Sequence, residues 1–227
     1  MINLSFCSGP YLSFFVFGLA IMLIPTTHAD TSAASVTIEA IRDSALRICV
    51  QKALPAGGSG SLDEITELKC HNQGVESVTG LEHLTGLRKL SLFRNRIQQF
   101  DVALPQSLES LNLARNQLDS LTLSQLPHLH ELFVFGNRLK GLELHHLPQL
   151  VSLRANDNRL TLFKYQGLEQ VEKIYLFNNQ LETLDIYHLP AMHYMDCRQN
   201  PMPDELYDEM DRLEQVTFLH DGNADDW

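Results

Sequence analysis

Ten histidines are the side chains in this sequence best suited to bind a metal ion. His145 and His146 are adjacent, and His188 lies further along the chain. A zinc site needs several ligand atoms about 2 Å from the ion, so such residues would have to converge on one point. The sequence also has no H-E-x-x-H pair, glycine-rich phosphate loop or G-x-S-x-G motif. The motifs therefore give no positive case for a metal site, a cofactor or catalysis, and we expect no enzyme activity.

The four cysteines must be read together with the start of the chain. The first 29 residues carry no charged side chain, and an apolar run extends from Tyr11 to Ile24. This run is shorter than the roughly 20 residues of a membrane span. Small residues at Thr27 and Ala29 precede Asp30, which predicts a signal peptide over residues 1–29 with cleavage before Asp30. No Lys or Arg precedes the run, so an uncleaved anchor stays open as the alternative.

Export would place the remaining cysteines in an oxidising compartment. Cleavage leaves Cys49, Cys70 and Cys197, an odd number that allows at most one intramolecular disulfide.

The charge of the chain is acidic and uneven. The formal net charge is -11, which disfavours nucleic acid as a partner because binding to it depends on neutralising phosphates. Residues 204–227 are rich in Asp and Glu, with Arg212 as the single base. This segment is typical of a solvated tail.

A 21-residue period governs the middle of the chain. Asparagines recur at positions 95, 116, 137, 158, 179 and 200, within copies of the pattern L-x-x-L-x-L-x-x-N-x-L in which other apolar residues replace some leucines and the copy at Asn200 is degenerate. Alternation within x-L-x-L-x is the period of a strand, so the leucines point to one side and the x residues to the other. One turn cannot bury its leucines alone, and copies must stack into a parallel sheet. We expect each Asn amide to bond backbone groups of adjacent turns.

This pattern resembles the leucine-rich-repeat (LRR) family, in the secreted bacterial type with 21-residue repeats, over residues 62–203. The resemblance implies a curved solenoid with a parallel β-sheet on its concave side. The second half of each repeat is too short for a helix, so extended or 3-10 segments are expected on the convex side. In this register His146 and His188 lie two turns apart, or about 10 Å, which argues against a shared metal ion.

Both ends of a solenoid need covering. Residues 30–61 are predicted to form a linker and an N-terminal cap helix over residues 36–54, with Ile38 or Ile41, Ala45, Ile48 and Cys49 near one face. Cys49 would lie on the buried face of the cap and Cys70 at an inward position of the first strand. We predict a disulfide between them, as secreted family members carry cysteines in this cap; two reduced, buried thiols are the alternative.

The C-terminal cap is predicted within residues 204–227. Pro203 and the acids after it favour a helix from Asp204 to Leu213, with Leu206, Met210 and Leu213 on the last repeat. Cys197 occupies an inward leucine position, which is typical of a small core residue.

The x positions of the strands define the predicted binding face. Large aromatic residues and Arg are common anchors of protein interfaces. The strand register places seven of them on this concave face: Phe93, Phe133, Phe135, Arg154, Tyr175, Phe177 and Tyr194. We take Phe133, Phe135, Tyr175 and Phe177 as the predicted hot spot. The alternative is that these rings only support the sheet by stacking on one another.

The leading functional hypothesis is a secreted protein–protein interaction module that binds a macromolecular ligand, a protein or an acidic glycan. It would act outside the cell or in the periplasm as a monomer, with membrane contact only if the N-terminal segment stays uncleaved. A membrane-anchored structural or adhesive surface protein is the second hypothesis. An enzyme inhibitor or enzyme is the third, and it lacks a convergent polar site in the sequence.

Overall fold

The structure is a computed structural model that describes residues 37–55 and 60–222. The predicted signal peptide, residues 1–29, lies outside the described residues, as do residues 223–227 of the predicted tail. No helix within the described ranges combines the length and apolar character needed to cross a bilayer.

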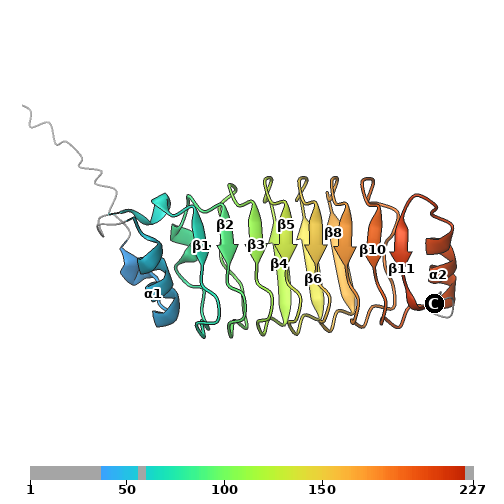
Figure 1. Cartoon of the computed structure of the whole chain (residues 1–227), viewed down its shortest axis with the longest axis horizontal. Coiled ribbons are helices and arrows are strands. Elements are labelled where there is room, and N and C mark those ends of the chain that lie inside the picture. Colours follow the sequence, from blue (N-terminus) through green and yellow to red (C-terminus); the bar gives the residue numbers. More distant parts are fainter. Residues whose placement is uncertain (1–36, 56–59, 223–227) are drawn as a thin grey trace, which may run out of the picture. The chain divides into compact units, whose positions relative to one another are not determined.

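Eight short parallel strands, each from a successive turn of the chain, form the larger of two sheets. Neighbouring strands pair in register, so that Leu90 lies beside Leu68 on one side and Leu111 on the other. Figure 1 shows the strands stacked side by side. In spatial order they are β1 Glu67–Lys69, β2 Lys89–Ser91, β3 Ser110–Asn112, β5 Glu131–Phe133, β7 Ser152–Arg154, β9 Lys173–Tyr175, β10 Tyr194–Asp196 and β11 Thr217–Leu219.

The middle residue of each of these strands points into the core. Leu90, Leu111, Leu132 and Leu153 each expose 1% or less of their surface. Burying one such side chain contributes roughly 2 kcal/mol, but only when the next turn covers it. The predicted parallel-sheet solenoid is therefore confirmed, and its core is the column of leucines repeated every 21 residues.

The recurrent asparagines form the predicted ladder inside the turns. The Asn137 amide nitrogen donates to the carbonyl oxygens of Leu113 and Val134 at 3.0 and 2.9 Å. Its side-chain oxygen accepts the Leu118 N–H at 3.1 Å. Asn116, Asn158, Asn179 and Asn200 repeat this arrangement. Each side chain thus satisfies backbone groups that the tight turn leaves unpaired.

The other side of the solenoid carries extended segments and 3-10 turns, as the repeat length predicts. Three extended segments pair into a second parallel sheet, β4 Ser120–Ser124, β6 Gly141–His145 and β8 Leu162–Gln166. Leu121, Leu142 and Phe163 point inward from them and close the core opposite the larger sheet. Two 3-10 helices lie in the first turns, Leu62–Glu64 and Leu81–His83.

At the N-terminal end, helix α1 (Ser44–Ala53) packs against β1. The helix is shorter than predicted, because Asp43 caps it and residues Ile38–Ala40 form a separate 3-10 turn. The expected buried face was also partly wrong. Leu46 and Val50 are fully buried with Ile41, whereas Ile48 is 50% exposed.

At the C-terminal end, helix α2 (Asp204–Asp211) buries Tyr207 and Met210, while Leu206 and Leu213 are half-buried. Strand β11 follows the helix and pairs with β10, placing Phe218 beside Met195. The sequence reading expected only a cap helix and tail here and missed this strand. Figure 1 shows α2 and β11 together at this end of the stack.

Candidate functional site

The outward side chains of the larger sheet make a continuous surface, which we call the sheet face. It comprises the seven predicted residues Phe93, Phe133, Phe135, Arg154, Tyr175, Phe177 and Tyr194, together with their strand neighbours. Pairing of β5 with β7 and of β7 with β9 sets Phe133, Arg154 and Tyr175 directly beside one another. The structure thus brings three predicted residues from three separate turns into one row.

Arg154 occupies the centre of this row. Its guanidinium carbon lies 4.9 Å from the centre of the Tyr175 ring and 5.8 Å from that of the Phe133 ring. The Tyr175 ring in turn contacts Tyr194, with ring centres 5.4 Å apart. A cation between aromatic faces is attracted by their negative centres. The row therefore holds the Arg154 side chain in place.

Phe93 belongs to a second aromatic group nearer the N-terminal end. Arg115 lies 5.8 Å from the centre of its ring, and His71 meets the ring edge-on at 5.9 Å. Phe135 and Phe177 occupy equivalent positions on two turns, with the buried Asn156 on the turn between them.

The six aromatic residues are less exposed than the sequence predicts. All six are half-buried, and none is among the exposed large apolar residues of the described chain, which are Ile48, Leu162 and Tyr187. Stacking between neighbouring strands covers part of each ring, as the alternative hypothesis anticipated. Their contribution to binding would come from rings already fixed in place rather than from freely exposed side chains.

The acidic side chains of the sheet face already have partners. Glu67 pairs with Lys69 at 2.6 Å, and this hydrogen bond holds the pKa of the Glu67 carboxyl below its ordinary value. Glu131 accepts a hydrogen bond from the Ser110 hydroxyl at 3.2 Å.

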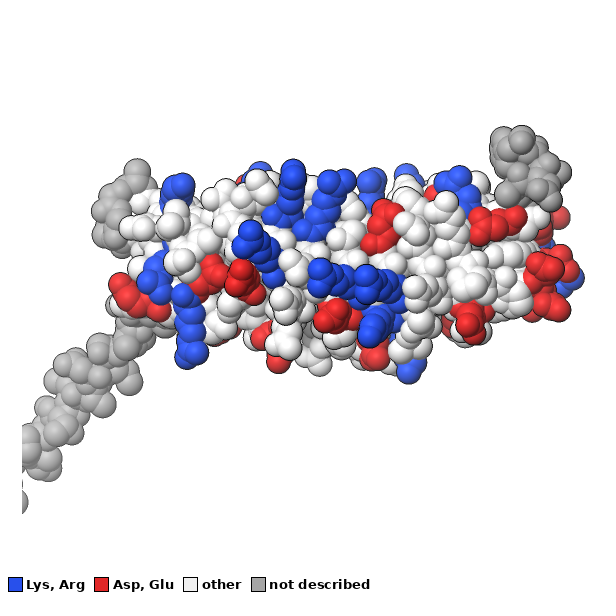
Figure 2. Space-filling model, turned by 90° about the horizontal axis from the view of Figure 1, so that it is seen from below, with Lys and Arg blue, Asp and Glu red and all other residues white. Residues whose placement is uncertain are grey.

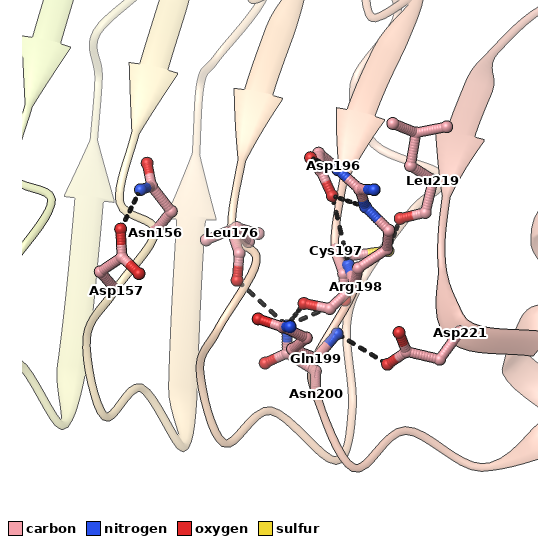
Figure 3. A network of polar contacts seen from close by, with 10 residues as sticks. All are labelled: Asn156, Asp157, Leu176, Asp196, Cys197, Arg198, Gln199, Asn200, Leu219 and Asp221. Carbon is pink, nitrogen blue, oxygen red and sulfur yellow. Dashed lines mark hydrogen bonds and ion pairs between the residues drawn. The ribbon is translucent and has the colours of Figure 1, made fainter. Parts of the chain in front are cut away.

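Asp196 is the one buried acid of the sheet face, and its partner is Arg198. The guanidinium of Arg198 donates to both carboxylate oxygens of Asp196 at 3.0 and 2.8 Å, as Figure 3 shows. This hydrogen-bonded pair raises the pKa of Arg198. The pair neutralises itself and offers little charge to a ligand.

Three cations of the sheet face differ from Arg198. Lys89, Arg154 and Lys173 form no ion pair with any residue in the described ranges. Figure 2, which views the molecule from below and thus edge-on to the sheets, shows further Lys and Arg side chains along the middle of the solenoid. A chain with a net charge of -11 therefore carries, on this face, three cations that have no carboxylate within ion-pair distance.

Two hollows in the described surface differ in where they lie. One, of about 350 Å³, is on the sheet face itself between β1 and β5, with Lys69, His71, Lys89 and Phe133 in its lining. A larger one, of about 600 Å³, was not predicted from sequence. Its lining is polar and comes from the loops around Glu76–Thr79 and Arg96–Asp101. The repeated leucines and asparagines do not line it, so the repeat pattern alone did not predict it.

The histidines do not form a metal site in the part of the chain that the structure describes. His145 lies 3.6 Å from Glu143 on its own turn. His188, two turns further along the solenoid, lies 2.8 Å from Asp185. No group of three or more His, Cys, Asp or Glu side chains in the described ranges is placed to hold an ion.

The cysteines adopt the predicted arrangement. Cys49 and Cys70 form a disulfide with their Cα atoms 5.7 Å apart, which ties α1 to β1. Cys197 is buried in the core, and burial raises the pKa of its thiol to about 12. Such a thiol is a poor nucleophile.

Known leucine-rich-repeat proteins share the repeat and the solenoid fold of this chain. The family model of the Leucine Rich Repeat matches residues 107–129, one turn of the pattern that recurs every 21 residues. The chain is a leucine-rich-repeat solenoid. No curated protein sequence matches it.

Solved structures of bacterial LRR proteins resemble the solenoid. Internalin C2 from Listeria monocytogenes is 19% identical, with a TM-score of 0.51, over 80% of this chain and 95% of that one. The functional domain of InlJ from Listeria monocytogenes is 19% identical, with a TM-score of 0.41, over 81% of this chain and 60% of that one. YopM from Yersinia enterocolitica is 26% identical, with a TM-score of 0.49, over 70% of this chain and 36% of that one. The chain thus spans under two thirds of InlJ and of YopM, and the likeness to internalin C2 shows the fold alone.

Proposed function

We propose that this LRR solenoid is an exported, non-enzymatic interaction module that binds a macromolecular partner through its sheet face. LRR folds are typical of protein–protein interaction modules, and this chain adds specific features. The observation that carries the proposal is the row Phe133–Arg154–Tyr175, in which rings from two turns flank a cation from the turn between them that forms no ion pair. Rigid aromatic and Arg anchors are what interface hot spots use.

Export is part of the same proposal. The predicted signal peptide and the Cys49–Cys70 disulfide both fit an oxidising compartment, either the periplasm or the extracellular space. Cys197, in contrast, is buried in the core, away from oxidants and other thiols. We expect the exported protein to be a monomer, since a free sheet face is needed for the partner.

The test is a pull-down with residues 30–227 as bait, using envelope extract, host-cell lysate and a glycan panel. The bait is compared with a variant in which Phe133, Phe135, Tyr175 and Phe177 are replaced by Ala. Loss of these four rings should weaken capture of a specific partner by at least about 100-fold. Binding by the partner at unchanged affinity would place the site elsewhere on the solenoid.

A matched control addresses the opposite sheet. Thr122, Glu143 and Lys164 point outward from β4, β6 and β8, and their replacement by Ala should leave capture unchanged. Because the four aromatic residues are half-buried, each is also replaced singly, and circular dichroism verifies that every variant is folded. A control variant that loses the partner would assign binding to the smaller sheet.

A further inference from the structure

The Arg154 guanidinium is pre-oriented for a ligand that the chain does not supply. The ring of Tyr175 lies on one side of it and that of Phe133 on the other, at 4.9 and 5.8 Å. On the side away from Arg154, the Tyr175 ring contacts that of Tyr194, with ring centres 5.4 Å apart, and this contact restrains it. An Arg side chain held in this way loses less conformational entropy when its planar fork forms hydrogen bonds.

Three other arginines of the solenoid are occupied by carboxylates. Arg88 pairs with Glu109, Arg96 lies 3.6 Å from Glu76, and Arg198 is bound by Asp196. The side chain of Arg154 is exposed and forms neither a hydrogen bond nor an ion pair with a residue of the described ranges. Its two register partners, Phe133 and Tyr175, have no carboxylate to offer.

The acids nearest to Arg154 in the strand order form no ion pair with it and contact other groups. Glu131, on β5, accepts from the Ser110 hydroxyl, and Asp196, on β10, is buried beneath its pair with Arg198. Lys173 on the adjacent strand β9 adds a second cation without an ion pair in the described chain. The centre of the sheet face therefore attracts an anion, and its planar guanidinium selects one with two parallel oxygens.

We propose that Arg154 anchors a carboxylate of an acidic peptide segment on the protein partner. The inference rests on the proposed function and names the chemistry of the ligand. A carboxylate would accept two parallel N–H bonds from the guanidinium fork, which a Lys ammonium does not provide. Phe135 and Phe177 lie two residues beyond Phe133 and Tyr175 on the neighbouring turns and are half-buried, so apolar side chains beside the acid would contact them. A peptide offers both groups, whereas an acidic glycan has no apolar side chains.

The experiment uses an arrayed peptide library in which every Asp or Glu peptide has a matched Asn or Gln form. Residues 30–227 should capture peptides that combine a carboxylate with neighbouring Leu or Phe, and the amide forms should bind at least about 10-fold more weakly. Heparin serves as the glycan probe. Equal binding of acid and amide forms, absence of captured acidic peptides, or capture of heparin in their place would overturn the proposal.

Variants of the anchor separate its roles. Arg154→Lys keeps the charge but not the fork, and both it and Arg154→Gln should lose at least about 10-fold in affinity for the captured peptides. Arg138→Gln is the matched control, because Arg138 is exposed on a neighbouring turn and forms no ion pair within the described residues. An Arg154→Lys variant that binds as well as wild type would overturn the proposal.

The same data distinguish this proposal from the more general one. If Arg154 variants bind normally while the four-alanine variant does not, the sheet face binds but Arg154 is not its anchor. If neither change affects binding, the sheet face itself is not the site. Unfolding midpoints of the Arg154 variants should equal that of wild type, since the side chain is exposed.

Discussion

The ladder asparagines show most directly how one residue type at one spacing determines the turn. The Asn137 amide satisfies a carbonyl of its own turn, a carbonyl of the preceding turn and an N–H group in the segment that leaves the preceding turn. It is buried, with 9% of its surface exposed, so water cannot replace these bonds. A longer or shorter side chain would not reach all three groups from the same backbone position.

Replacing Asn137 by Ala should therefore lower the free energy of unfolding by about 3 kcal/mol, because three buried backbone groups lose their partner. Urea unfolding followed by circular dichroism measures the change. Arg138→Ala is the control on the adjacent exposed residue and should change stability by less than about 0.5 kcal/mol. An Asn137→Ala midpoint equal to that of wild type would refute the role assigned to the ladder.

The spacing of residues in the sequence predicts which residues share a surface, but it does not predict how their side chains pack there. The 21-residue register placed Phe133, Arg154 and Tyr175 in one column, and the structure keeps them there. It could not predict that the rings are half-buried, because this depends on side-chain rotamers. The Arg198–Asp196 pair was predictable in principle, since residues two apart on a strand point to the same side.

At the scale of elements, the start of α1 depends on Asp43. One carboxylate oxygen accepts the Leu46 N–H at 2.9 Å and caps the helix. The other accepts the N–H groups of Glu76 and Ser77 at 2.9 and 3.2 Å and ties the helix to the loop after β1. The sequence reading began the helix earlier, because apolar periodicity continues through Ile38 and Ile41 and does not mark a cap.

Asp43→Asn should reduce stability near neutral pH, and the reduction should shrink in acid. Burial raises the pKa of Asp43, but the N–H donors of Leu46, Glu76 and Ser77 outweigh this and keep the pKa below its ordinary value. Because the pKa of Asp43 is lower in the folded state, its charge contributes fully to stability when the pH is above its pKa in the unfolded chain, about 3.9. This contribution is lost as the pH falls through the pKa of Asp43 in the folded protein. At about pH 7 we expect a loss near 1 kcal/mol, because Asn keeps one oxygen for the Leu46 N–H but has an NH2 group in place of the oxygen that accepts from Glu76 and Ser77.

Thermal unfolding of wild type and Asp43→Asn from about pH 7 to about pH 2.5 measures the effect. The two curves should converge at the acidic end. Asp63→Asn is the control, because Asp63 is exposed on the 3-10 turn Leu62–Glu64 and does not cap α1. A gap between Asp43→Asn and wild type that widens in acid would contradict the assignment.

Strand β11 shows where element prediction from the repeat ends. Phe218 takes the inward position beside Met195, yet it follows after a helix rather than after the 21-residue interval. The strand also lies within an acidic segment that is typical of a solvated tail. Only the stacking of His220 on Tyr207, at 4.7 Å, and the pairing with β10 reveal that this segment completes the core.

At the scale of the whole molecule, stability is a sum over turns and their interfaces, so the ends matter as much as the centre. The disulfide between Cys49 and Cys70 joins α1 to β1 at the N-terminal end, across 21 residues of sequence. Residues 56–59 of this interval lie outside the described residues. Closing a loop of this length restricts the unfolded chain and stabilises the folded one by roughly 3 kcal/mol.

Removing this bond should therefore expose the dependence of the solenoid on its N-terminal end. We expect the Cys49→Ser, Cys70→Ser double variant of residues 30–227 to lose about 3 kcal/mol in urea unfolding. Wild type in excess dithiothreitol should fall to the same free energy of unfolding, while the stability of the double variant should not change with the reductant.

In non-reduced wild type, iodoacetamide should modify only Cys197, and only after unfolding, because this thiol is buried with its pKa raised to about 12. A wild-type protein equally stable with and without reductant would show that the solenoid does not need the link, and an oxidising compartment would then not be required for its fold.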